Sequence, residues 1–232
     1  ILKAGRRGSD LVKQILAFSR QSEHAIIPIK PQQTLRETLK FSRATIPSTI
    51  SIIEDIQNDC GLILADPTQF HQVALNIITN AYQAMEETGG TISVGLQERE
   101  IDTVVSADIA LEPGKYAVLT VTDTGPGIEP RVFERIFEPY FTTKKPGKGN
   151  GIGLAVVYRI IKNHKGDIHV ATEPGKGATF EVFFPLLEEA PANERLEVSE
   201  VGTAGVERIL LVDDEEPIVK LEKDLLERFG YS

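Results

Sequence analysis

The chain has 232 residues, 41% of them hydrophobic and 25% charged, a composition typical of a globular protein with one sizeable core and flanking pieces. Its 34 acidic residues outnumber its 25 basic residues, and the net charge of -9 argues against a nucleic-acid partner because phosphate backbones are bound mainly through Lys and Arg. The single cysteine, Cys60, excludes an internal disulfide framework and a cysteine-built zinc site, and we expect it in the core or at a strand edge.

The N-terminal part of the chain predicts a helix that precedes the main domain. Apolar residues recur at near-helical spacing in residues 9–20, which indicates an amphipathic helix. Two prolines in residues 26–33 favour extended backbone, and Thr34 is then the predicted N-cap of a helix that runs to about Ala44. We therefore place a domain boundary after residue 25.

Residues 26–187 predict one layered α+β domain. Asp66 and Pro67 are suited to cap and begin a helix that runs to about Glu87, where a pair of glycines ends it. Another helix is predicted at residues 153–163. Alternating or β-branched residues predict strands at 49–56, 91–97, 116–122, 167–172 and 179–184.

The C-terminal part predicts a linker and the beginning of a further domain. Residues 188–206 contain five glutamates against one arginine, a net charge of -4, which indicates an acidic linker. Residues 207–232 predict a buried strand, an acidic cluster and a helix. No run of about 18 apolar residues and no signal-peptide core occurs, so we expect a cytoplasmic chain, with any membrane anchor of the parent protein in other segments.

Two asparagines on the helix after Pro67 are the first candidate site residues. Asn76 and Asn80 are four residues apart, so they share a helix face beside the apolar stripe. An asparagine carbonyl is a hard oxygen ligand that can hold Mg²⁺ while the ion bridges nucleotide phosphates. For the pair alone, two solvated helix residues remain the alternative interpretation.

A turn with candidate ligand-binding residues follows the strand at residues 116–122. The turn reads DTGPGI, residues 123–128, and Gly125 and Gly127 permit positive φ and close approach of a ligand to the backbone. Asp123 at the strand end can accept a hydrogen bond from an exocyclic amine, and burial would make that bond discriminating. An aspartate that only closes an Asx turn is the alternative.

An aromatic segment and a second glycine-rich loop come next. The segment VFERIFEPYFTTKK, residues 132–145, has an aromatic cluster for which a core position is the alternative interpretation. GKGNGIGL, residues 147–154, precedes a helix whose N–H groups and dipole form a phosphate cradle, and nearby lysines such as Lys144 add cationic donors. The glycine spacing matches neither the dinucleotide fingerprint nor the P-loop.

The order and spacing of these motifs resemble the histidine kinase ATPase family over about residues 26–185. The segments that carry the resemblance are the asparagine helix, DTGPGI, IFEPYFTTK, GNGIGL and GKGATF. The resemblance implies a Bergerat-type α/β sandwich that binds ATP between its sheet and a mobile lid at about residues 142–150. It also implies that Asn80 is the Mg²⁺ ligand, Asp123 the partner of the adenine amine and Thr179 an adenine-side hydroxyl. The implied ATP and Mg²⁺ site comprises Asn76, Asn80, Asp123, Gly125, Gly127, Ile128, Phe137, Phe141, Thr142, Thr143, Lys144, Gly149, Asn150, Gly151, Ile152, Gly153, Leu154 and Thr179.

The flanking segments resemble other parts of hybrid two-component sensor kinases. Residues 6–20 resemble the second helix of the dimerisation and phosphotransfer hairpin, which implies a helix bundle in a homodimeric parent. ILLVDDEE, residues 209–216, resembles the start of a receiver domain in which Asp213 and Asp214 would help to hold Mg²⁺, although the rest of that site is missing. A receiver domain or response regulator is therefore the implied phosphorelay partner.

The histidines indicate that the phosphoacceptor lies outside this chain. In the family the substrate histidine is followed by an acidic residue that takes its proton. None of the chain's 4 histidines, which are His24, His71, His164 and His169, has such a neighbour. We therefore expect a kinase fragment that cannot phosphorylate itself.

Other functions of the same nucleotide fold are the alternatives. Gyrase-like and chaperone-like ATPases place a water-activating glutamate four residues before the metal-binding asparagine, and here that position is Asn76, whose amide is no general base. A serine-directed kinase does not account for the flanking segments. A module that binds nucleotide without chemistry remains an alternative for this piece.

Overall fold

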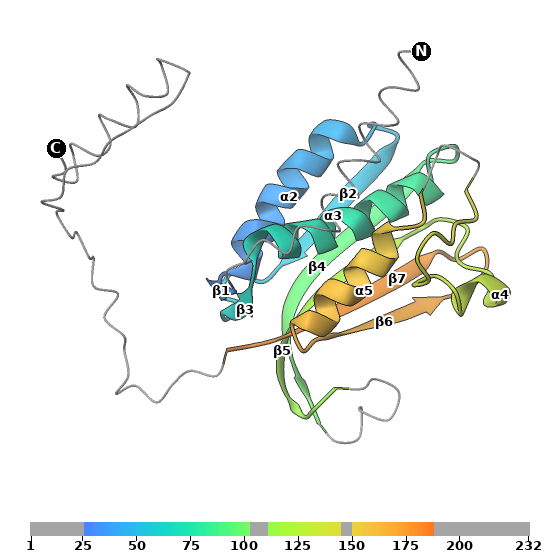
Figure 1. The fold of residues 1–232 in the computed structure, drawn as a ribbon. Helices are drawn as coiled ribbons and strands as arrows, with labels where there is room; N and C mark the ends of the chain where they lie inside the picture. Colours follow the sequence, from blue (N-terminus) through green and yellow to red (C-terminus); the bar gives the residue numbers. More distant parts are fainter. Residues whose placement is uncertain (1–25, 103–110, 145–149, 188–232) are drawn as a thin grey trace, which may run out of the picture. The chain divides into compact units, whose positions relative to one another are not determined.

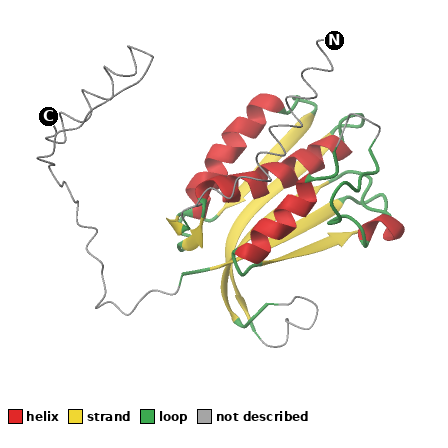
Figure 2. Cartoon of the chain, viewed as in Figure 1, coloured by secondary structure: helices red, strands yellow, loops and turns green. Residues whose placement is uncertain are grey.

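The computed structural model describes residues 26–102, 111–144 and 150–187 (Figures 1 and 2). A mixed five-stranded sheet has the strand order β2-β4-β5-β7-β6, and this confirms the predicted α+β class. The strands are β2 (Ile50–Ile56), β4 (Gly90–Ile101), β5 (Gly114–Asp123), β7 (Ala178–Pro185) and β6 (Asp167–Thr172). Each strand predicted in residues 26–187 is present, and β4 and β5 are longer than expected. The helices are α2 (Pro31–Thr45), α3 (Pro67–Ala84), α4 (Pro130–Phe133) and α5 (Gly153–Asn163).

The long helices α2, α3 and α5 lie on the same face of the sheet (Figures 1 and 2). β2 and β4 are parallel, so a crossover must join them, and α3 forms most of it. The remaining neighbours in the sheet are antiparallel. Two short strands missed in the sequence, β1 (Ile27–Ile29) and β3 (Ile63–Ala65), pair antiparallel beside the main sheet. The connections thus place α3 between α2 and α5 over the sheet.

The core lies between the sheet and these helices. Alternate residues of each central strand point towards the helices because side chains alternate between the two faces of a strand. α3 is buried along much of its surface and packs against this face. The buried side chains include Phe70, Val73, Ile77 and Ile78 of α3, Ile92, Val94 and Leu96 of β4, Leu119 and Val121 of β5, Phe180, Val182 and Phe184 of β7, and the cysteine Cys60.

The N-terminus of α3 forms as the sequence predicts. Asp66 is the N-cap, and its Oδ1 accepts hydrogen bonds from the backbone N–H groups of Thr68 at 2.7 Å and Gln69 at 3.3 Å. Pro67 occupies the first helical position, where its missing N–H costs nothing. A local motif therefore sets the beginning of the helix that carries both candidate asparagines.

Two helix boundaries differ from the predictions. α2 begins at Pro31 rather than after Thr34, because a proline is well accommodated in the first helical turn. Thr34 lies inside this helix, where its carbonyl accepts a hydrogen bond from Thr38 Oγ1 at 2.8 Å. α3 ends at Ala84, before the predicted Glu87, and the chain then turns so that Gly89 N donates to Met85 O at 2.8 Å.

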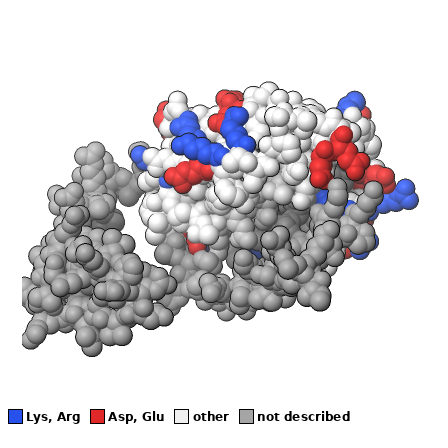
Figure 3. Space-filling view, turned by 90° about the horizontal axis from the view of Figure 1, so that it is seen from above, with Lys and Arg blue, Asp and Glu red and all other residues white. Residues whose placement is uncertain are grey.

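The surface of the described residues mixes charges of both signs. The face seen from above shows acidic and basic side chains next to one another (Figure 3). Some of them form ion pairs, such as Arg43 with Glu54 at 2.9 Å. Among the described residues, no helix combines the length and the apolar character needed to cross a bilayer.

Several predictions fall on parts of the chain that the structure does not describe. These are the N-terminal hairpin helix in residues 1–25, the linker in residues 188–206 and the receiver fragment in residues 207–232. The predicted site residues Gly149, Asp213 and Asp214 also lie outside the described residues.

Candidate nucleotide-binding site

The structure brings the candidate asparagines of α3 next to the start of α5. A Cβ atom placed on Gly153 would lie 3.6 Å from Asn76 Oδ1 and 3.9 Å from Asn80 Nδ2. Both asparagines are half-buried, and both face the helix that follows the second glycine loop. Two side chains about one helical turn apart on α3, which are far from this loop in the sequence, thus lie next to it in the fold.

Asp123 is a buried carboxylate at the end of β5, with an exposed fraction of 5%. Its Oδ1 accepts a hydrogen bond from Gly125 N at 2.8 Å, and the backbone N–H of Ala178 also donates to the carboxylate. Burial raises the pKa of Asp123 above its ordinary value, and these two N–H groups oppose part of the rise. The site therefore keeps an acidic acceptor in a position shielded from water.

Gly127 is required by the turn that follows Asp123. Its φ is +73°, and a Cβ atom there would lie 2.4 Å from the carbonyl oxygen of Glu173. The next residue, Ile128, donates its N–H to Thr172 Oγ1 at 2.9 Å and packs against the core. The DTGPGI turn is thereby attached to the β6–β7 turn, which fixes the backbone around Asp123.

The aromatic segment and the second glycine loop are held together by backbone contacts. Tyr140 N donates to Gly151 O at 2.9 Å, and a Cβ atom on Gly151 would lie 2.6 Å from Phe141 O. The ring of Phe137 packs on that of Tyr158 in α5, with centroids 5.3 Å apart. The two segments thus form one wall beside the start of α5.

Lys144 extends from this wall to α3. Its Nζ donates to Asn80 Oδ1 at 3.1 Å and also to Gln83 Oε1. Burial lowers the pKa of the Lys144 ammonium group below its ordinary value. The amide oxygen of Asn80 therefore already faces a cation, and its position fits a magnesium ion. Gln83 was missed in the sequence, although its place one turn after Asn80 was a signal for it.

Thr179 is not brought into this group. Residues alternate along β7, so Ala178 and Phe180 face the helices while Thr179 points to the opposite face of the sheet. There its Oγ1 lies 3.0 Å from Thr122 Oγ1, in a hydrogen bond between β7 and β5. In this segment, the backbone N–H of Ala178 bonds to the Asp123 carboxylate, and Gly177 lies against the Asp123 backbone.

The remaining predicted residues are either exposed or packed against the core near the start of α5. Thr142 and Thr143 are exposed, and Thr142 Oγ1 accepts the N–H of Lys144 at 3.2 Å. Asn150 Oδ1 accepts the N–H of Ile152 at 3.3 Å. Ile152 and Leu154 are partly buried against the core, as is Phe137, and they anchor the start of α5.

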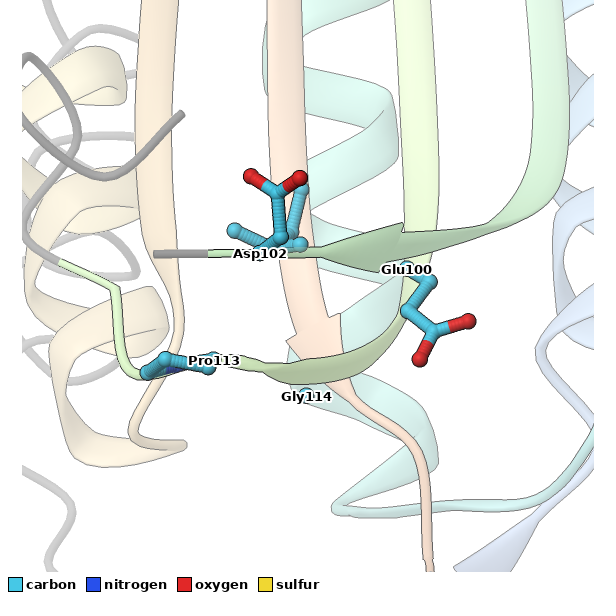
Figure 4. Close-up of a pocket in the computed structure, with 5 residues that line it drawn as sticks. Glu100, Asp102, Pro113 and Gly114 are labelled. Carbon is cyan, nitrogen blue, oxygen red and sulfur yellow. The ribbon is translucent and has the colours of Figure 1, made fainter. Parts of the chain in front are cut away.

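A separate hollow of about 620 Å³ lies where β4 and β5 continue beyond the helices (Figures 1 and 4). Its lining consists of Glu100, Ile101, Asp102, Pro113 and Gly114. The carboxyl groups of Glu100 and Asp102 point in different directions (Figure 4). Two carboxylates repel a phosphate group, so this hollow does not suit a nucleotide.

The sequence matches known kinases over most of its described part. Residues 65–188 match the family model described as histidine kinase-, DNA gyrase B-, and HSP90-like ATPase. The sensor kinase CckA of Brucella abortus is 36% identical over 100% of this chain and 25% of its own length. The histidine-protein kinase AtoS of Escherichia coli is 33% identical over 76% of this chain and 26% of its own length. The chain thus spans about a quarter of the length of these curated relatives.

The fold of the chain also matches solved structures. Full-length ShkA in complex with AMPPNP superimposes with a TM-score of 0.65 at 25% identity, over 99% of this chain and 45% of that one. The mycobacterial sensor histidine kinase MprB superimposes with a TM-score of 0.55 at 26% identity, over 69% of this chain and 97% of that one.

Proposed function

We propose a function from one premise: the chain belongs to the family of histidine kinase-, DNA gyrase B-, and HSP90-like ATPases. Within that family it carries the catalytic domain of a histidine kinase, and we infer that it binds Mg²⁺-ATP at the site between Asp123 and the start of α5. In the parent protein this site would transfer the γ-phosphoryl group to a histidine, for relay to an aspartate of a receiver domain.

The buried carboxylate of Asp123 is the observation that carries this proposal. It accepts hydrogen bonds from backbone N–H groups and belongs to a turn that the close approach of Gly127 to Glu173 holds in place. Such an acceptor pairs with the exocyclic amine of adenine. It repels the carbonyl oxygen that guanine has at the same place, because two acceptors without a proton between them are left unpaired.

The phosphate end of the nucleotide would lie at the start of α5. Ile152 is the N-cap of this helix and has no hydrogen-bonding side chain, so its side chain does not satisfy the first N–H groups, which suit an anion. Gly153 leaves room there beside Asn76 and Asn80. Asn80 Oδ1 would hold Mg²⁺, and when bound the ion neutralises charge on the phosphate oxygens.

The residues near the site support phosphoryl transfer to another group rather than activation of water. Asn76 holds the place where related ATPases have a glutamate, and its amide cannot take a proton from water. His164 is buried, where its Nδ1 bonds to Ile160 O at 2.7 Å, and His71 Nδ1 bonds to Thr38 Oγ1 at 2.8 Å. We therefore infer that the acceptor histidine belongs to a phosphotransfer hairpin of a homodimeric parent.

Calorimetric titration of the chain with ATP and GTP in the presence of Mg²⁺ tests the binding proposal. ATP should bind and GTP should bind at least about 100-fold more weakly, because a site built for a donor rejects an analogue without it. Equal affinity for the two nucleotides would contradict the role of Asp123. Asn80→Ala should bind ATP equally well with and without Mg²⁺, and a normal response to Mg²⁺ would contradict the role of Asn80.

The phosphotransfer proposal has its own test. Incubation of the chain with γ-labelled ATP should leave no acid-labile phosphate on it, while a longer version that includes the phosphotransfer hairpin should become labelled. Labelling of His24, His71, His164 or His169 in this chain would contradict the assignment of the acceptor to another segment.

A further inference from the structure

Two side-chain amides of α3 share a single cation. Asn80 and Gln83 are three residues apart, so they lie on the same face of the helix. Both oxygens accept from the ammonium group of Lys144, with the Asn80 contact at 3.1 Å. The contact crosses from the aromatic segment to the helix and joins residues far apart in the chain. The ammonium group is therefore bound by two oxygens that converge on one point.

This arrangement competes directly with a metal ion. A lysine ammonium group has three donors and no acceptor, so it uses the same oxygen lone pairs that a divalent cation would use. Mg²⁺ binds its oxygen ligands at about 2.0–2.1 Å, so a metal ion on Asn80 Oδ1 would lie close to an ammonium group on the same oxygen. Two cations at such short range also repel one another strongly. Lys144 and Mg²⁺ therefore exclude each other at Asn80.

We propose that Lys144 is an internal cation that occupies the magnesium position until the metal arrives, and that Gln83 is the positioning residue that holds it there. The proposal rests on the proposed function, in which Asn80 is the magnesium ligand. Binding of Mg²⁺ with the nucleotide then requires the ammonium group to leave α3. Phosphate oxygens of the nucleotide replace the amide oxygens as its acceptors, so the displaced charge stays paired.

Gln83→Leu tests this proposal because it removes one of the two oxygens and leaves Asn80 intact. The affinity for ADP is measured by calorimetry with Mg²⁺ and with EDTA, and the ratio of the two affinities reports the benefit of the metal. This ratio should rise about tenfold in the variant, because Lys144 then competes less strongly with the metal. Tenfold corresponds to about 1.4 kcal/mol, the contribution of the one lost hydrogen bond to the ammonium group. Gln72→Leu, three turns earlier on α3, is the matched control and should leave the ratio unchanged.

A measurement without nucleotide tests the contact itself. In the metal-free protein, Lys144→Met should shift the side-chain amide NMR signals of Asn80 and Gln83 and leave that of Gln72 in place. Unshifted signals would show that the ammonium group does not occupy these oxygens, and the proposal would fail. Circular dichroism of each variant confirms that the fold is kept.

The outcomes separate this proposal from the function on which it rests. Wild-type chain that binds no ADP in Mg²⁺ rejects the proposed function. Wild-type chain that binds ADP, with an unchanged ratio in Gln83→Leu, rejects the role of Lys144 alone. A lower ratio in Gln83→Leu also rejects it, because Gln83 would then support the metal rather than its competitor.

Discussion

Replacing Asp123 with asparagine removes a buried negative charge and keeps the size of the side chain. The amide oxygen of the variant can still accept the N–H of Gly125, which leaves its NH₂ group on the side of the ligand. Two donors then face each other where the adenine amine would bind. A hydrogen bond to a charged acceptor contributes about 1.5–3 kcal/mol, so ATP affinity should fall by about 10-fold to 150-fold or more.

The same substitution should not cost stability at neutral pH. Burial raises the pKa of Asp123 in the folded chain above its value in the unfolded chain. The contribution of this carboxyl group to the free energy of unfolding is therefore complete at pH values below the ordinary carboxyl pKa. It is lost as the pH rises through the pKa of the folded state. Asp123→Asn has no such loss. The variant should therefore be at least as stable as the wild-type chain at pH 7.5, and its advantage should shrink when the pH is lowered towards 4.

Calorimetry with ATP and urea denaturation at pH 4.5 and 7.5 check these two expectations. Asp167→Asn is the matched control, because Asp167 is another buried carboxylate of the sheet but pairs with Lys162 at 2.6 Å. The control should keep its ATP affinity and lose about 1 kcal/mol or less, as expected for a partly exposed ion pair. ATP affinity within about threefold of wild type in Asp123→Asn, a change well below one hydrogen bond, would refute the adenine assignment. A variant less stable than wild type at pH 7.5 would refute the electrostatic reasoning.

Three other predictions concern the framework of the site. Gly127→Ala should lower the free energy of unfolding by more than the roughly 1–2 kcal/mol of a left-handed residue, because its Cβ would also meet Glu173 O. Gly175, whose φ is +82°, is the control, because a Cβ atom there would have no atom within 4 Å. Gly175→Ala should therefore lower the free energy of unfolding only by the cost of the left-handed backbone. Equal losses of unfolding free energy for the two variants in urea denaturation would contradict the steric argument. Burial, with help from nearby carboxylates, raises the pKa of the Cys60 thiol to about 11. Alkylation of Cys60 at pH 8 should be about 100-fold slower in the folded chain than in urea, and equal rates would place the thiol at the surface. Asp66→Ala removes the acceptor of two N–H groups and should cost about 1 kcal/mol, whereas an unchanged midpoint in denaturation would mean that water replaces the cap.

The sequence alone was sufficient where structure depends on neighbours in the chain. Asp66 and Pro67 predicted the start of α3 because a cap and a first-turn proline act within a few residues. The strands of the five-stranded sheet were recognisable for the same reason, since alternation is local, whereas the short strands β1 and β3 were missed. The order of the motifs predicted the family, and the positive φ values of Gly127 and Gly151 agree with the glycine-rich turns.

The tertiary structure decided which side chains share the site. The strand register places the backbone of Ala178 beside Asp123 and directs Thr179 to the other face of the sheet. Ala178 and Thr179 are adjacent in the sequence, and motif matching does not resolve which of the two lies at the site. The contact of Lys144 with Asn80 and Gln83 joins segments more than 60 residues apart and depends on how α3 packs against the aromatic segment. Local patterns therefore determined the elements and the chemistry available, while long-range packing determined that an ammonium group lies on the proposed metal ligand.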